Sequence, residues 1–170
     1  MIDGKLEKAL NDQINMELHA WYSYLSMAAY CKGRNLTGFG AFMENHAVEE
    51  QAHATRLLNY LLDRGGRVNL QAISAPEAKF DSLLDIFVKA VDQEKRNTRA
   101  IYELYDLAKG INDYSTVSAL QWFLDEQVEE EKVMTEALGL MQFAGDDKGA
   151  LLALNQQFGS QAATAPKEKE

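Results

Sequence analysis

The sequence predicts an all-α fold: a four-helix bundle with one long crossover connection and a short fifth helix. Glycine and proline gather between long stretches of helical periodicity, and alternating runs rich in β-branched residues, typical of strands, are missing. The helical stretches cover about residues 5–32, 36–64, 80–109 and 113–143, with a shorter one at about 148–158.

The connections predict how the helices are ordered. About three residues join the first helix to the second and the third to the fourth, which favours two antiparallel hairpins. The middle connection, about 65–79, is longer. A helix of ~30 residues is about 45 Å long, and an extended linker of ~15 residues reaches roughly 50 Å. The linker can therefore run the length of the bundle and start the third helix at the far end.

Local signals mark the predicted helix ends and close contacts. Asn35 and either Asn112 or Asp113 follow interrupting glycines and are predicted N-caps. Three glycines fall inside predicted helices, where each costs up to ~1 kcal/mol relative to alanine, so we expect close packing at them. These glycines are Gly38, Gly40 and Gly139.

Composition restricts the domain count and the partners. The 170 residues suit one domain, at 1–161, followed by a small, polar tail at 162–170 that we expect to be disordered. A net charge of −9 argues against nucleic acid as a partner and is compatible with attracting cations. Residues 1–8 show no secretory signal, and no stretch reaches the ~18 apolar residues that span a bilayer. We therefore expect a cytoplasmic protein with no membrane partner.

Each of the four long helices carries polar groups at the middle of an otherwise apolar face. Glu17, Glu50 and Glu94 lie near the midpoints of the first three helices, and Gln127 and Glu130 near that of the fourth. Because midpoints coincide whichever way a helix runs, these groups should meet in one layer. Buried carboxylates repel one another and lose hydration, and no Lys or Arg occupies the central positions. Shared protons or salt bridges are alternatives, but bound metal explains the layer better.

The donor types indicate which metal. Carboxylates with one imidazole suit Fe or Mn rather than a closed zinc site, which favours thiolates. His53 follows Glu50 by three residues, so both side chains can point at one ion, and Glu50 is central enough to bridge two. This E-x-x-H spacing is weak evidence alone and gains its weight from the other three helices.

An acidic run at 125–131 indicates a further site. Such a run normally forms a solvated face, but Glu126 and Glu129, with Glu49 of the second helix, would flank the central layer. They could hold a third metal or pass ions onward. His46, one turn before the E-x-x-H pair, is predicted to be mainly a packed structural residue, with a supporting role at the site as the alternative.

These residues resemble the ferritin family over essentially the whole chain, and most closely the bacterial non-haem ferritins. The matching segments are Asn15 to Leu18, Glu49 to His53, Glu94, Gln121 to Phe123 and Glu126 to Lys132. The resemblance implies a ferritin-like di-iron domain that oxidises Fe(II) to Fe(III) with O2 or peroxide. It also implies a shell of 24 identical chains that stores the ferric mineral, for iron storage and detoxification.

The same resemblance assigns roles to residues at the centre. The first iron would be bound by Glu17, Glu50 and His53. The second would be bound by Glu50, Glu94 and Glu130, with Gln127 close by. An accessory third iron would be bound by Glu49, Glu126 and Glu129. Tyr24 matches a tyrosine beside the centre, although a core aromatic role is the alternative.

Departures from related families narrow the resemblance. Bacterioferritins carry a second E-x-x-H on the fourth helix, where this chain has Gln127 and Glu130, and a haem-binding methionine at the position of Gln51. We therefore expect no haem. Rubrerythrins add a cysteine-rich iron domain, which the single Cys31 cannot supply.

Two other functions are open from the sequence. A di-iron oxidase acting on an organic substrate would need a cavity beside the metals, whereas large inward residues predict a filled core. These residues are Trp21, Tyr24, Phe42 and Phe87. A non-catalytic helical interaction protein would leave the coincidence of four polar midpoints unexplained.

Overall fold

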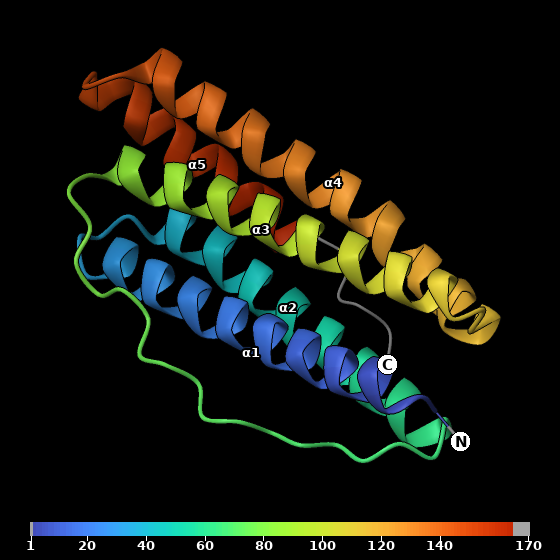
Figure 1. Ribbon diagram of the computed structural model, residues 1–170. Helices are drawn as coiled ribbons and strands as arrows, with labels where there is room; N and C mark the ends of the chain where they lie inside the picture. Colours follow the sequence, from blue (N-terminus) through green and yellow to red (C-terminus); the bar gives the residue numbers. More distant parts are fainter. Residues whose placement is uncertain (1, 165–170) are drawn as a thin grey trace.

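Five α-helices make up the chain in the computed structural model, which describes residues 2–164 (Figure 1). The helices are α1 (Gly4–Lys32), α2 (Thr37–Asp63), α3 (Leu83–Gly110), α4 (Tyr114–Ala144) and α5 (Lys148–Thr164). Helices α1 and α2 pack as one hairpin and α3 and α4 as another, and α1 also packs on α3. The predicted all-α bundle with a short fifth helix is confirmed, and no strand occurs within residues 2–164.

A long crossover connects the two hairpins. Figure 1 shows it running along α1 from the end of α2 to the opposite end of the bundle, as the linker length predicts. Asn11 of α1 holds its first part: the side-chain amide donates to the Arg67 carbonyl at 2.9 Å, and its oxygen accepts from the Asn69 backbone N–H at 2.6 Å. At the other end the Ser26 hydroxyl donates to the Glu77 carbonyl.

Three of the four long helices are capped at the N-terminus by the side chain of the residue that directly precedes the helix. Asp3 caps α1, Ser82 caps α3, and Asp113 caps α4 by accepting from the Thr116 backbone N–H at 3.0 Å. The prediction of Asn35 as a cap is wrong. The residue at the start of α2 is Leu36, while Asn35 has a positive φ of 60° and serves the turn that follows α1.

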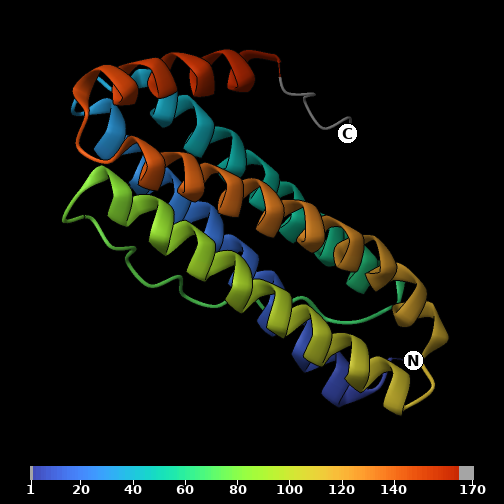
Figure 2. The ribbon, with the colours of Figure 1, turned by 90° about the horizontal axis from the view of Figure 1, so that it is seen from above.

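The missing cap of α2 comes from α5. Asn155 is buried, and its side-chain oxygen accepts hydrogen bonds from the backbone N–H groups of Gly38 at 3.0 Å and Phe39 at 3.1 Å. A Cβ at Gly38 would lie 1.7 Å from the Asn155 carbonyl oxygen, so only glycine allows this approach. Close packing is confirmed there and at Gly40, but is wrong for Gly139, which has open space around it. Figure 2 shows α5 folding back from α4 along α2.

Two boundaries differ from the prediction. Helix α3 begins at Leu83 rather than 80, because Phe80 packs into the core against Tyr30 instead of joining the helix. Helix α5 continues to Thr164 rather than ending at 158, so residues 162–164 of the predicted tail are helical, and 165–170 lie outside the described residues.

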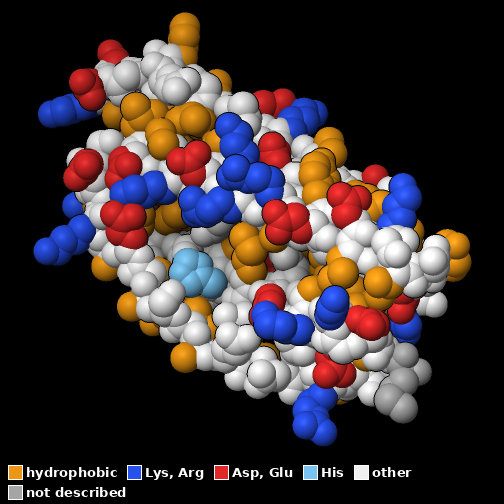
Figure 3. Space-filling view, viewed as in Figure 1, with side chains coloured by type: hydrophobic (Ala, Val, Ile, Leu, Met, Phe, Trp, Pro, Cys, Tyr) orange, Lys and Arg blue, Asp and Glu red, His pale blue; other side chains and the backbone are white. Residues whose placement is uncertain are grey.

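The core has an apolar cluster at each end and a polar layer between them. One cluster, near α5, includes Phe39, Phe87 and Phe158, and the other includes Leu10, Leu57 and others from all four long helices. The polar layer holds the buried Glu, His, Gln and Asn side chains described below. On the face seen in Figure 3, acidic and basic side chains are interspersed. Within residues 2–164, no helix combines the length and apolar character that crossing a membrane requires.

Replacing Asn155 tests the docking of α5. Because Asn155→Ala removes the acceptor for two buried N–H groups, we expect a loss of about 1–2 kcal/mol in local stability. Amide hydrogen exchange should accelerate at residues 37–40 and throughout α5. Gln157→Ala, at an exposed position on the same helix, is the matched control. Equal exchange in both variants would show that Asn155 does not hold α5.

Candidate metal centre

Four helices bring six predicted residues into one buried layer. Each of these side chains belongs to a residue that is no more than 6% exposed. They are Glu17 from α1, Glu50 and His53 from α2, Glu94 from α3, and Gln127 and Glu130 from α4. Ligand atoms of Glu17, Glu50 and His53 lie within 4.8 Å of one another, close enough to share one ion. The predicted coincidence of helix midpoints is therefore present in the fold.

Several donor atoms in this layer lack hydrogen-bond partners among the described residues. They are Oε2 of Glu50, Oε2 of Glu94 and both ring nitrogens of His53. His53 Nδ1 lies 3.5 Å from Glu50 Oε2, which is longer than a good hydrogen bond. Leaving such groups unpaired in a core is costly, and the carboxylate oxygens and one nitrogen of the neutral imidazole each offer a lone pair to a cation. The donor set therefore fits a metal.

Charge balance supports the same fit. None of the described Lys or Arg residues is buried. Burial raises the pKa of Glu50 well above its usual range, and the nearby charges of Glu94 and Glu17 raise it further. Burial also raises the pKa of Glu94, to about 7, with the charge of Glu130 adding to the effect. The raised pKa values favour the protonated carboxyls when no metal is bound, and a bound cation would displace these protons.

His46 is the cation in this region. Its Nδ1 lies 2.9 Å from Glu49 and 3.2 Å from Glu130. Burial alone would lower the pKa of His46, but the hydrogen bonds and charges of these two carboxylates raise it to about 10. Its ring also packs on Phe42, with centroids 4.7 Å apart. His46 thus packs in the core, as predicted, and also forms ion pairs with two acidic residues.

Tyr24 fits both readings of its position. It is fully buried in the apolar cluster near α5, and its hydroxyl donates a hydrogen bond to Glu94. Burial and the charges of Glu94 and Glu50 raise its pKa well above the usual value, so it stays a neutral donor. Tyr24 therefore fixes one oxygen of Glu94 and leaves the other, Oε2, without a partner.

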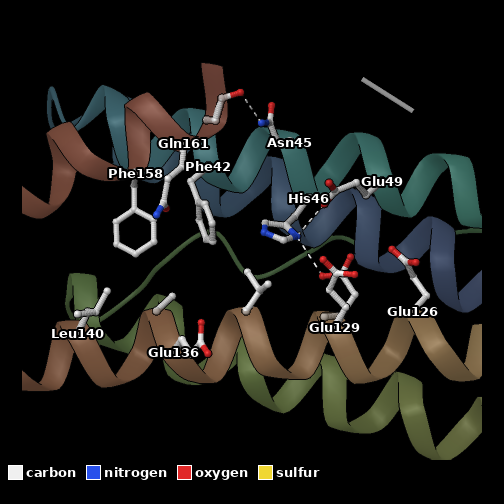
Figure 4. Close-up of a pocket in the computed structure, with 14 residues that line it drawn as sticks. Phe42, Asn45, His46, Glu49, Glu126, Glu129, Glu136, Leu140, Phe158 and Gln161 are labelled. Atoms are coloured by element: carbon white, nitrogen blue, oxygen red, sulfur yellow. Dashed lines mark hydrogen bonds and ion pairs between the residues drawn. The ribbon is translucent and has the colours of Figure 1, made fainter. Parts of the chain in front are cut away.

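A cavity of about 370 Å³ leads from the layer to the surface between α2, α4 and α5 (Figure 4). Its inner end is formed by His46 and Glu130, and the acidic residues predicted as a third site line it. They are Glu49, Glu126 and Glu129. Figure 4 shows Glu49 on one side, facing Glu126 and Glu129 of α4 on the other. Toward Phe158 and Leu140 the lining of the cavity is largely apolar.

Comparison with known proteins agrees with this geometry. The family model of the ferritin-like domain matches residues 7–144. The chain belongs to the ferritin family. It is 40% identical over 160 residues to the bacterial non-haem ferritin of Staphylococcus aureus, covering 94% of this chain and 96% of that one. The corresponding protein of Staphylococcus epidermidis is 37% identical over 162 residues, covering 95% and 98%.

Solved structures show the same fold. The open pore ferritin from the hyperthermophilic archaeon Archaeoglobus fulgidus matches with a TM-score of 0.92 at 38% identity, over 94% of this chain and 98% of that chain. The resemblance drawn from the sequence is thus confirmed, as is the ferritin-like bundle.

The sequence analysis missed four contacts in and around this ferritin's polar layer. Gln13 and Asn97 both donate hydrogen bonds to Glu17. Trp122 packs edge-on against His53, with ring centroids 5.4 Å apart, and the Arg56 guanidinium lies over its ring. Asn97 follows Glu94 by three residues on α3, and this spacing could have predicted that Asn97 faces the polar layer and contacts Glu17.

The raised pKa of Glu94 predicts how the metal-free protein responds to pH. Because its pKa rises from 4.5 to about 7 on folding, the stabilising proton is fully bound at low pH and is lost as pH rises through about 7. We expect roughly 3 kcal/mol of stability to be lost over this range. Denaturation of chelator-treated protein at a series of pH values measures it. Glu94→Gln should flatten the dependence of the free energy of unfolding on pH. Glu103→Gln, on the exposed side of α3, should leave this dependence unchanged. An unchanged pH dependence in Glu94→Gln would contradict the assignment to Glu94.

Proposed function

We propose that this ferritin stores iron and detoxifies it by oxidising Fe(II) to Fe(III) at a di-iron centre in the middle of its bundle. The observation that carries the proposal is the set of unpaired, buried donor atoms on Glu50, His53 and Glu94. They face one another in a layer without buried Lys or Arg among the described residues. The names of the relatives, bacterial non-haem ferritins, support iron as the metal.

The ligand assignment follows the positions of the donors. The first ion is held by Glu17, Glu50 and His53, whose ligand atoms already lie within reach of one ion. The second is held by Glu50, Glu94 and Glu130, with Gln127 close by. Gln127 donates to the Thr98 hydroxyl at 3.2 Å, so its amide is held in the layer. Glu50 bridges the two ions because it is central and its Oε2 is unpaired.

Bound Fe(II) supplies the electrons, and two ions together provide the two that reduce O2 to hydrogen peroxide or peroxide to water. The chain contributes the rest. Hard carboxylate oxygens favour Fe(III) over Fe(II). Glu50 releases a proton when the ions bind, because its pKa is raised well above the usual range, and Glu94, with a pKa of about 7, releases one from its protonated fraction. The Tyr24 hydroxyl holds one oxygen of Glu94 in place.

The acidic cavity is the route by which oxidised iron leaves. Glu49, Glu126 and Glu129 line it directly beyond Glu130 and form an accessory third iron site. A group of His46, Glu49 and Glu130 atoms within 4.8 Å joins this site to the second ion position. Iron bound at Glu130 therefore has carboxylates to move to, and mineral forms outside the bundle.

The storage compartment is a homo-oligomeric shell of 24 chains in the cytoplasm. The similarity to an open pore ferritin supports assembly. Large exposed apolar residues, such as Phe143 at 93% and Tyr114 at 74%, offer contact surface between chains. No haem takes part in the proposed function, since Gln51 replaces the expected methionine.

The cavity bears on the rival function. Phe42 and Phe87 are buried in the core, as predicted, but Phe42 also lines the cavity beside His46. An organic substrate in this cavity would meet the carboxylates of Glu49, Glu126 and Glu129. Such a wall suits cations better than an apolar molecule. The oxidase is therefore the second candidate.

Removing the bridge tests the centre. Glu50→Ala takes a ligand from both ions, so we expect it to abolish the fast phase of Fe(II) oxidation in stopped-flow absorbance. Glu44→Ala, a partly exposed glutamate on the same helix, is the control and should oxidise iron like the wild type. An unchanged fast phase in Glu50→Ala would refute the bridging assignment.

Removing one cavity carboxylate tests the third site. Because Glu129 lies outside the central layer, Glu129→Ala should keep the rapid oxidation rate. The number of ions bound per chain in an anaerobic Fe(II) titration should fall by one. If the count is unchanged while Glu50→Ala lowers it, Glu129 does not hold iron.

A further inference from the structure

Two buried amides form a closed ring with Glu17. Gln13 Nε2 donates to Glu17 Oε1 at 2.8 Å, and Asn97 Nδ2 donates to Glu17 Oε2 at 2.8 Å. The two amides are joined by a third hydrogen bond of 2.6 Å, from Gln13 Nε2 to Asn97 Oδ1. The three residues are 4%, 1% and 0% exposed in the order Gln13, Asn97, Glu17, so water does not compete for these bonds.

The ring permits one orientation of each amide. The Gln13 amide has two hydrogens, and both are used, one toward Glu17 and one toward Asn97. Turning either amide over would point a carbonyl oxygen at a carboxylate oxygen. Each oxygen of Glu17 still keeps a lone pair for a metal, because a carboxylate offers about four acceptor positions. The ring therefore holds the carboxylate without blocking it.

No other central carboxylate is held in this way within the described residues. Glu50 has an unpaired Oε2, and Glu94 has Tyr24 on one oxygen and an unpaired Oε2. Glu130 is approached by His46 on one oxygen. Glu17 alone has both oxygens bound by amides from two helices, α1 and α3.

We propose that Gln13 and Asn97 are positioning residues that orient Glu17 for the ion it shares with Glu50 and His53. The inference rests on the proposed function, because it assumes that this position binds metal. It extends that function by making one of the two ion positions pre-organised before metal arrives. Hydrogen-bond partners of metal ligands of this kind contribute about 10- to 100-fold in metal affinity.

The test uses Co(II), which is stable in air and whose visible absorption reports its ligands. Metal-free full-length protein is titrated with Co(II), and affinities are fitted for the two central ions. Gln13→Leu should lower the affinity for one Co(II) ion by about 10- to 100-fold and change the absorption band of that ion. The affinity for the other ion should stay the same. Asn97→Ser, a smaller change that leaves the fold less perturbed, should weaken the same ion.

Gln93→Leu is the matched control. Gln93 is a buried amide on α3, 7% exposed, whose Nε2 has no hydrogen-bond partner among the described residues. A general packing defect would affect Gln93→Leu as much as the ring variants, and would appear in the thermal unfolding of the metal-free proteins. Only a positioning role changes one ion and spares the other.

The outcomes separate the two claims. If the wild type binds no Co(II) in the bundle, the proposed function fails. If the wild type binds two ions and both ring variants bind them with unchanged affinity, the di-iron centre stands and the positioning role is refuted. Equal weakening of both ions in every variant, Gln93→Leu included, also refutes it.

Discussion

Burying several carboxylates in one layer is the constraint around which this bundle is organised. Glu17, Glu50, Glu94 and Glu130 are withdrawn from water at the centre of four helices, where each charge loses several kcal/mol of hydration. One protonated imidazole, that of His46, offsets part of this charge. Apolar clusters on both sides of the layer supply the burial energy that tolerates it. A fold of this kind is consistent with a cation as the missing partner.

The two sides of the layer differ, and the difference gives the proposed chemistry a direction. Between α1 and α3 the layer is closed by the amides of Gln13 and Asn97. Between α2 and α4 it opens into an acidic cavity, and α5 closes only one end of that face, held by its cap on α2. In the proposed function, ions held on the first side would leave by the second.

Most of the fold and the centre could be predicted from the sequence, because helical periodicity fixes which side chains face inward and midpoints meet regardless of direction. Several of the errors come from contacts between distant segments. The cap of α2 comes from Asn155, 117 residues away from Gly38, and no local pattern shows it. Asn97 and Thr98 are neighbours on α3 that are both buried, whereas helical periodicity alone does not predict two adjacent inward residues. His46 resembled a packed histidine because its partner Glu130 lies on another helix.

The measurement that tests the account most directly is the iron retained per chain after aerobic loading. A large excess of Fe(II) is added in air, the protein is separated by size exclusion, and iron is assayed in the protein peak. The account predicts many irons per chain, far more than the ligands of the bundle can hold, in a very large, iron-coloured species. About two irons per chain in a small species would contradict storage and favour an oxidase with a two-metal centre. No retained iron would contradict the metal centre itself.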